Sequence, residues 1–207
     1  MAIRTAQLLM LRALLLSAGT VAALISPGQL VQPDVREYGT RDGLSHGQVT
    51  AMARDNRDHL WIGTVDGLNR FDGRHFKVYR NDGTQRSIAG SRIITLAVDS
   101  TGLLYIGTNA AYLTVLDPMA DTLVNVPLPT DSLSRQGEQV VHQVIMDRSG
   151  MVWLSHGAYA MSRFDPRTRT FRTVAIPSPD GTPPDRRGVV RFMEDDDRIF
   201  WLFLFKG

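Results

Sequence analysis

The chain lacks cysteine and is nearly free of lysine. The absence of cysteine among 207 residues excludes a disulfide framework, a thiolate metal site and a thiol nucleophile. Lysine occurs only as Lys77 and Lys206, and arginine supplies the other 21 of the 23 basic residues. Arg4 and Arg12 lie in an N-terminal stretch without acidic residues, so 21 basic and 21 acidic side chains remain for the rest of the chain. This neutral body argues against bulk binding to nucleic acid or to an anionic membrane.

Only one stretch is long and apolar, and it lies at the N-terminus. Arg4 and Arg12 precede the apolar residues 13–25, and Ser26-Pro27-Gly28 follows them. This order is typical of a secretory signal peptide, and the run is shorter than the ~20 residues that span a bilayer. We therefore predict a signal peptide at 1–26, a linker at 27–34 and export. An uncleaved membrane anchor and a buried core helix are the alternatives.

An internal repeat of 44 to 48 residues fills the remainder. The same spacing separates the members of three series, each with one residue per repeat. The series are Trp61, Tyr105, Trp153 and Trp201; Val49, Ile93, Val141 and Val189; and Asp55, Asp99, Asp147 and Asp195. Several markers that keep one period indicate a repeat architecture. The expected repeats cover residues 43–82, 83–131, 132–180 and 181–207.

Each of the first three repeats contains four short apolar runs, rich in β-branched and aromatic residues and separated by turn formers such as Asp72-Gly73. Such runs predict strands, and four antiparallel strands in about 45 residues are typical of a β-propeller blade. In the first repeat the expected strands are 49–53, 60–64, 68–71 and 76–79. The fold class predicted is therefore all-β.

Both ends of this array are expected to be incomplete. Val35–Tyr38 matches an outermost strand, and it is expected to close the last blade of a ring. The fourth repeat offers only two strands, at 189–193 and 199–205. We predict an incomplete ring of about three and a half blades plus the N-terminal closing strand, in other words the front of a longer propeller.

The first repeat resembles the two-component regulator propeller repeat. The residues that carry the likeness are Asp42-Gly43-Leu44-Ser45, then Leu60-Trp61-Ile62-Gly63-Thr64, then the segment 66–73. Later repeats show the same pattern with drift, and Phe203-Leu204 replaces Gly-Thr in the fourth. The resemblance implies the extracytoplasmic sensor region of a bacterial receptor. It also implies an output domain elsewhere, either a histidine kinase or a diguanylate cyclase, and a homodimeric parent.

The repeated residues favour structural roles over chemistry. The aromatic series is expected to pack between blades, and the aspartates are expected to accept backbone N–H bonds in tight turns. Gly63 and Gly107 are expected to permit close approach of neighbouring blades. The five histidines lack metal-ligand spacing, and no nucleotide loop or nucleophile motif is present. We expect no catalytic residue, no metal and no cofactor.

The loops of one face are the expected ligand site. In a propeller blade the connections before the first strand and between the second and third strands share a face, and such loops tend to bind ligands. The candidate residues there are His46, Arg86, Arg92, Arg135, Glu138 and His156.

The leading hypothesis is a non-catalytic sensor module on the periplasmic side of the inner membrane. Its expected partner is an extracytoplasmic small molecule, saccharide or protein. Contact with the membrane is expected only through a later C-terminal span or an uncleaved signal peptide. The alternatives are a propeller enzyme, either a lyase or a quinone-dependent dehydrogenase, and a plain interaction scaffold.

Overall fold

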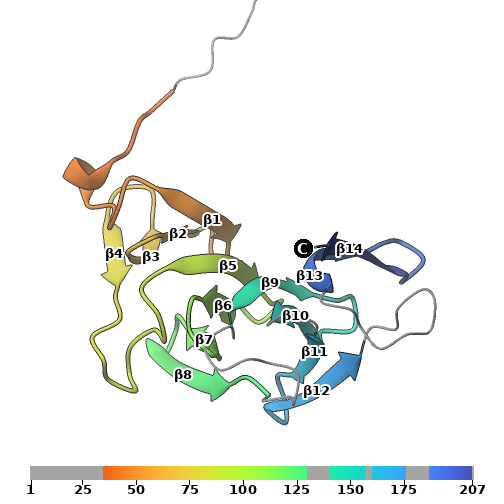
Figure 1. The fold of residues 1–207 in the computed structure, drawn as a ribbon. Helices are drawn as coiled ribbons and strands as arrows, with labels where there is room; N and C mark the ends of the chain where they lie inside the picture. Colours follow the sequence, from red (N-terminus) through yellow and green to blue (C-terminus); the bar gives the residue numbers. More distant parts are fainter. Residues whose placement is uncertain (1–34, 130–139, 157–159, 176–186, 207) are drawn as a thin grey trace, which may run out of the picture. The chain divides into compact units, whose positions relative to one another are not determined.

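The computed structural model describes residues 35–129, 140–156, 160–175 and 187–206 (Figure 1). The predicted signal peptide and linker lie outside these ranges. Within them, no helix is long and apolar enough to cross a membrane. By its contacts the chain divides after Glu37, and the strands all belong to the unit that begins at Tyr38.

All regular structure in the described residues is β, apart from the single 3-10 turn η1 (Thr40–Asp42). The strands of the first blade are β1 (Val49–Arg54), β2 (Leu60–Thr64), β3 (Gly67–Phe71) and β4 (Phe76–Tyr79). The second blade contains β5 (Ile93–Val98), β6 (Leu104–Thr108), β7 (Tyr112–Asp117) and β8 (Thr122–Pro127). The third blade contains β9 (Val141–Met146), β10 (Val152–His156), β11 (Ala160–Asp165) and β12 (Thr170–Ala175). The fourth sheet contains β13 (Arg187–Glu194) and β14 (Phe200–Lys206).

Each blade is an antiparallel meander in chain order, which confirms the predicted propeller class. Three sheets have four strands and the last described sheet has two. The first strands of successive blades are neighbours: β5 contacts both β1 and β9, and β9 contacts β13 (Figure 1). Each of these first strands pairs with the next strand through a register shift at the same place, as between Val49 and Ala51 in β1 and between Ile93 and Thr95 in β5. A bulge adds local twist, so the repeat preserves strand geometry as well as strand order.

Val35–Tyr38, which is expected to close the last blade of a longer ring, forms no strand with the described sheets. Residues 35–39 have no strand pairing, and the Val35 side chain is 82% exposed. A strand requires backbone partners on a neighbouring strand, and no described strand pairs with this segment. Tyr38 packs on the first blade instead, with its ring centroid 4.8 Å from that of Phe71 and 6.1 Å from that of Phe76.

The core lies between blades. One cluster joins Trp61 and Leu68 of the first blade to Ile93 and Leu104 of the second, and all four side chains are fully buried. A second cluster joins the second blade to the third in the same way, through residues that include Tyr105, Val141 and Phe164. Burying large apolar side chains is the main stabilising contribution. The predicted packing role of the aromatic series is therefore confirmed at Trp61 and Tyr105.

Glycine allows this close packing at two equivalent positions. A Cβ atom on Gly63 would lie 2.5 Å from Cγ2 of Ile93, and one on Gly107 would lie 2.7 Å from Cγ1 of Val141. Both neighbours are buried side chains of the next blade. The third blade has Ser155 at the corresponding position.

Side-chain hydrogen bonds also join successive blades. Thr95 Oγ1 accepts from the backbone N–H of Val144 at 3.1 Å. One repeat later, the amide of Gln143 bonds twice to the backbone of Phe192, with Oε1 accepting from N–H at 2.7 Å and Nε2 donating to C=O at 2.9 Å. Thr95 and Gln143 occupy the same repeat position, 48 residues apart. In the second and third blades this position therefore connects the blade to the backbone of the next one, whereas the first blade has Ala51 there.

The repeated aspartates organise the turn between the first two strands. Asp55 Oδ1 accepts the backbone N–H groups of Arg57 and His59 at 2.9 and 3.0 Å, as the turn interpretation predicts. Its other oxygen accepts from Trp61 Nε1 at 2.9 Å. Burial acts to raise the pKa of Asp55, but the hydrogen bonds from Trp61, Arg57 and His59 outweigh it and hold the pKa below its ordinary value.

The bond between the aspartate and the aromatic ring recurs in every blade. Asp99 accepts from Tyr105 Oη at 2.9 Å, Asp147 from Trp153 Nε1 at 2.7 Å and Asp195 from Trp201 Nε1 at 2.7 Å. The repeated aspartates and the repeated aromatic residues are thus joined by a hydrogen bond in each of the four described sheets. The sequence shows both series at a constant separation of six residues but does not show that they are bonded.

Candidate ligand-binding face

The loops predicted to share one face lie together in the first two blades. Gly67, which begins β3, donates its N–H to the carbonyl of Ser91 in the β4–β5 loop at 2.8 Å. The N–H of Asn109, after β6, bonds to the carbonyl of Arg92 at 3.2 Å. The segment before β1 joins the same group, because Val65 N–H bonds to the carbonyl of Gln48 at 3.3 Å. Backbone bonds therefore fix these loops to one another.

Buried polar side chains on the third strand of each blade hold this face from below. Asn69, Thr114 and Ser162 occupy equivalent positions on β3, β7 and β11, and all three are fully buried. A buried polar group is costly without a partner. Each of these three side chains is accordingly hydrogen-bonded.

In the first two blades, the side chains of Asn69 and Thr114 bond to a loop of the candidate ligand-binding face. Asn69 Oδ1 accepts from the N–H of Ser45 at 2.8 Å, and Asn69 Nδ2 donates to Ser45 Oγ at 2.8 Å. Thr114 Oγ1 accepts from the N–H of Ala89 at 3.4 Å and donates to Asn125 Oδ1 at 2.6 Å. Both loops are thus attached to a strand of their own blade.

His156 belongs to this buried layer in the third blade. Its side chain is 1% exposed, and Nε2 lies 2.7 Å from Ser162 Oγ, which in turn lies 3.2 Å from Thr173 Oγ1. His156 was predicted as a residue of the ligand-binding face. The structure places it beneath that face, because it takes the strand position that Thr64 and Thr108 occupy in the earlier blades.

The other predicted site residues are not brought into one cluster. His46 and Arg92 are both exposed. His46 Nδ1 accepts from the N–H of Gln48 at 2.9 Å, and Arg92 meets Asn109 through its backbone. In the parts of the chain that are described, no hydrogen bond or ion pair joins His46 to Arg92. Arg135 and Glu138 lie outside the described residues.

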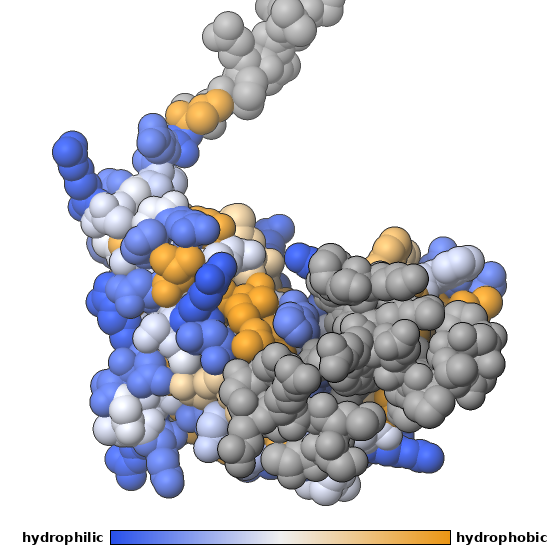
Figure 2. Space-filling view, viewed as in Figure 1, coloured by the Kyte–Doolittle hydropathy of each residue, from blue (hydrophilic) through white to orange (hydrophobic). Residues whose placement is uncertain are grey.

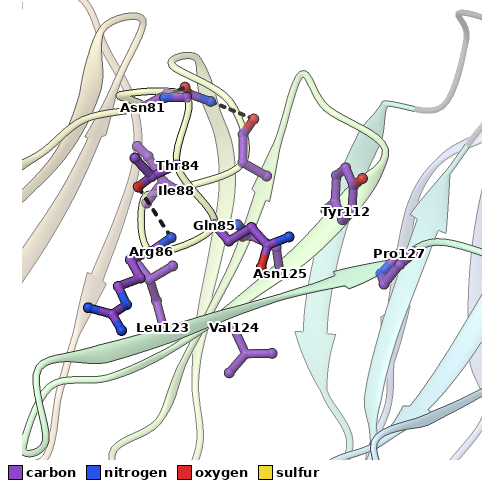
Figure 3. Close-up of a pocket in the computed structure, with 12 residues that line it drawn as sticks. Asn81, Thr84, Gln85, Arg86, Ile88, Tyr112, Leu123, Val124, Asn125 and Pro127 are labelled. Atoms are coloured by element: carbon purple, nitrogen blue, oxygen red, sulfur yellow. Dashed lines mark hydrogen bonds between the residues drawn. The ribbon is translucent and has the colours of Figure 1, made fainter.

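A groove opens beside the β4–β5 loop, on the second blade. It has a volume of about 660 Å3 and is lined by residues of the 81–89 loop, by Tyr112 of β7 and by Leu123, Val124, Asn125 and Pro127 of β8 (Figure 3). Of the sequence candidates, Arg86 alone lines it. Tyr112 and the β8 residues were missed, because nothing in the repeat pattern indicates which outer strand packs beside a loop.

Hydrogen bonds fix the loop that forms one side of the groove. Asn125 Nδ2 donates to the carbonyl of Ser87 at 2.9 Å, and Asn81 Nδ2 donates to the carbonyl of Ala89 at 2.7 Å. Ile88 is fully buried in the cluster between the first two blades. The groove is therefore a preformed feature with one rigid side.

Within the described residues, no group of three histidine, aspartate or glutamate side chains could hold a metal ion. The short contact between His156 and Ser162 is enclosed, since both residues are at most 1% exposed. A nucleophile and base must reach a substrate to act on it, and this pair does not.

Apolar side chains are also exposed on the last described sheet. Trp201 and Phe203 of β14 are 57% and 60% exposed, whereas the equivalent aromatic residues Trp61 and Tyr105 are fully buried. Over the first two blades, the face visible in Figure 2 is largely hydrophilic with smaller apolar patches.

A family model and a known protein are similar to short parts of the chain. The family model described as two component regulator propeller matches residues 43–66. Histidine kinase P4 of Formosa agariphila is 54% identical over 41 residues, which are 20% of this chain and 3% of that protein.

Solved structures show the same fold. The extracellular domain of the hybrid two-component system BT3049 from B. thetaiotaomicron superposes with a TM-score of 0.68 at 20% identity, over 81% of this chain and 23% of that one. The corresponding domain of BT4673 superposes with a TM-score of 0.63 at 18% identity, over 84% of this chain and 21% of that one. A streptogramin B lyase superposes with a TM-score of 0.51 at 12% identity, over 77% of this chain and 55% of that one. The chain thus spans less than a quarter of the two extracellular domains.

These likenesses agree with the residues that carry them. The matched segment 43–66 includes Gly63, Thr64 and the turn of Asp55, which the structure uses to pack and fix the first blade. Later blades repeat the same strand order, register shift and aspartate bond. The chain is therefore a β-propeller whose residues 43–66 match the two component regulator propeller model.

Proposed function

We propose that this chain is the extracytoplasmic, ligand-binding propeller of a bacterial two-component receptor. The observation that supports it most directly is the regulator-propeller match at residues 43–66, together with the 54% identity over 41 residues to a histidine kinase. In this proposal the chain itself is not an enzyme. A longer parent, acting as a homodimer, supplies the output domain, a histidine kinase or a diguanylate cyclase.

The ligand-binding face is the proposed sensing surface. Its loops are fixed to a rigid scaffold by backbone bonds and by the buried side chains of Asn69 and Thr114. Binding loops on a rigid scaffold are a common arrangement for recognition. The proposed ligand is an extracytoplasmic small molecule, saccharide or protein. The alternative of a propeller enzyme has no observation in its favour beyond the fold similarity to a lyase.

Export is tested with alkaline phosphatase, which is active only outside the cytoplasm. Residues 1–207 fused to the phosphatase should give activity in a bacterial host, whereas the matched fusion of residues 35–207 should not. If both fusions accumulate and the longer one is inactive, the proposed location is wrong.

Sensing is tested in the source bacterium. An in-frame deletion of residues 43–202 should abolish transcriptional induction on at least one of a panel of single carbon sources. A variant with Gly47→Ala is the control, since a Cβ atom there has no neighbour within 4 Å. Identical transcript profiles of deletion and wild type on every source would contradict the proposal.

A further inference from the structure

The groove beside the 81–89 loop has one charged side chain in its lining, Arg86. Asn81, Thr84 and Asn125 also line the groove, but each of these side chains is hydrogen-bonded within the protein. By contrast, the side chains of Gln85, Arg86 and Tyr112 have no hydrogen-bond or ion-pair partner within the described ranges. These three groups are the ones that remain for a ligand.

The charge of the residues that line the groove favours a ligand of the opposite charge. A guanidinium binds a planar carboxylate or a sulfate oxygen pair through two parallel N–H bonds. The nearest carboxylate on the loop, that of Asp82, does not line the groove and accepts from the N–H and hydroxyl of Thr84 at 2.9 and 2.7 Å. With a single cation and no acid among the described lining residues, the groove matches a single negative charge.

The opposite end of the groove is aromatic and apolar. Figure 3 shows Arg86 near Leu123 at one end, and Tyr112 with Pro127 at the other. The side chain of Tyr112 is 40% exposed. An exposed aromatic face next to apolar side chains favours stacking of a flat ring. The volume of about 660 Å3 is in the range of small-molecule sites.

We propose that this groove binds a small organic monoanion, a carboxylate or a sulfate ester, in which a ring is separated from the anionic group by a spacer. Arg86 binds the anion, Gln85 donates to it or to the spacer, and the ring lies against Tyr112. The role of such a ligand as a signal rests on the proposed sensor function. The binding site itself does not, because it follows from the lining of the groove.

The test is a titration of the purified full chain with defined probes, followed by calorimetry. The carboxylate probe is 4-phenylbutyrate and the sulfate probe is 3-phenylpropyl sulfate. The neutral analogue 4-phenyl-1-butanol lacks the charge, and butyrate lacks the ring. At least one of the two charged ring probes should bind in the millimolar range or better, and both analogues should bind at least about tenfold more weakly. The charged probe that binds more tightly shows whether the groove prefers a carboxylate or a sulfate ester.

Variants locate the site. Arg86→Gln should lower the affinity for the charged probe at least about tenfold. Tyr112→Ala should also lower this affinity, whereas Tyr112→Phe should leave it unchanged. Arg57→Gln is the matched control, since Arg57 is an exposed arginine of the turn after β1 and does not line this groove. Circular dichroism confirms that each variant is folded.

Three results would overturn the proposal. They are no binding of either charged probe to folded chain, equal binding of the neutral analogue, and equal weakening by Arg57→Gln and Arg86→Gln. None of them depends on export or on transcription, so failure of the groove and failure of the sensor function are distinguishable.

Discussion

Replacing Asp55 by alanine tests whether the repeated aspartates stabilise the blades chiefly through the buried aromatic ring. Trp61 is fully buried, and its indole N–H donates to Asp55. Removing the acceptor leaves a buried donor without a partner, which costs about 1–3 kcal/mol. The turn also loses the acceptor of two backbone N–H groups, for a further cost of about 1 kcal/mol. The free energy of unfolding should therefore fall by about 2–4 kcal/mol.

The fourth sheet supplies the matched control. Asp195 likewise accepts from two backbone N–H groups and from Trp201, but it lacks the 3.1 Å contact between Asp55 Oδ2 and His59 Nδ1, and Trp201 is 57% exposed. Water can replace the carboxylate there, so Asp195→Ala should destabilise the protein much less than Asp55→Ala. Urea unfolding followed by far-ultraviolet circular dichroism measures both changes.

A double mutant isolates the indole bond. In a Trp61→Phe background no indole donor exists, so Asp55→Ala should cost less than in the wild type by about 1–3 kcal/mol. Two results would refute the reasoning: an equal cost of Asp55→Ala in both backgrounds, or equal costs of Asp55→Ala and Asp195→Ala in the wild type. Either one would mean that burial of the aromatic donor does not set the energetics of the turn.

Four further outcomes are expected. The pKa of Asp55 is held below its ordinary value, so the stability that this carboxyl contributes is complete above the unfolded-state pKa of about 3.9 and is lost as the pH falls through the folded-state pKa. Urea titrations from pH 6 to pH 2.5 should therefore show wild type and Asp55→Ala converging in stability, and a constant difference would contradict this. Gly63→Ala forces a methyl group against the next blade and should cost about 1–3 kcal/mol in urea unfolding, whereas Gly47→Ala should cost nothing measurable, and similar costs would mean that the blades can separate freely. Gln143→Ala should increase hydrogen exchange in β13 while leaving the first blade unchanged, and unaltered exchange in β13 would show that the amide does not hold the fourth sheet. The exposed apolar side chains of β14 should promote self-association, so Trp201→Arg should lower the sedimentation coefficient at a given concentration, and a monomeric wild type would disprove this.

Strand positions are the part of the structure that the sequence predicts best. The expected strands of the first blade differ from the observed ones by one residue at most, at the end of β1 and at the start of β3. The reason is local: alternating apolar residues, bounded by turn formers such as Asp72 and Gly73, restrict where a strand can begin and end. The same local rule gives the turn role of Asp55 and the packing role of Gly63.

From the sequence, the candidate ligand-binding face could be predicted only as a set of loops. Topology places the loops on one side, but side-chain burial depends on what fills each strand position. His156 is a polar residue at a position that faces the interior, and its Nε2 lies 2.7 Å from Ser162 Oγ on the next strand. A polar residue in a loop-forming stretch resembles a surface residue in sequence, and the difference arises only when the strands pair.

Only tertiary contacts determine whether Val35–Tyr38 forms a strand and whether a groove opens beside the 81–89 loop. The N-terminal segment has the composition of a strand, but strand structure requires a partner, and none of the described strands pairs with it. The groove forms because Asn125 on β8 binds the carbonyl of Ser87, 38 residues earlier in the chain, which holds the loop beside the outer strand. By itself the sequence determined the period, the strands, the turns and the glycines, because these depend on neighbours along the chain. The tertiary structure decided which polar groups are buried and where a cavity opens, because these depend on residues that come together only when the blades pack.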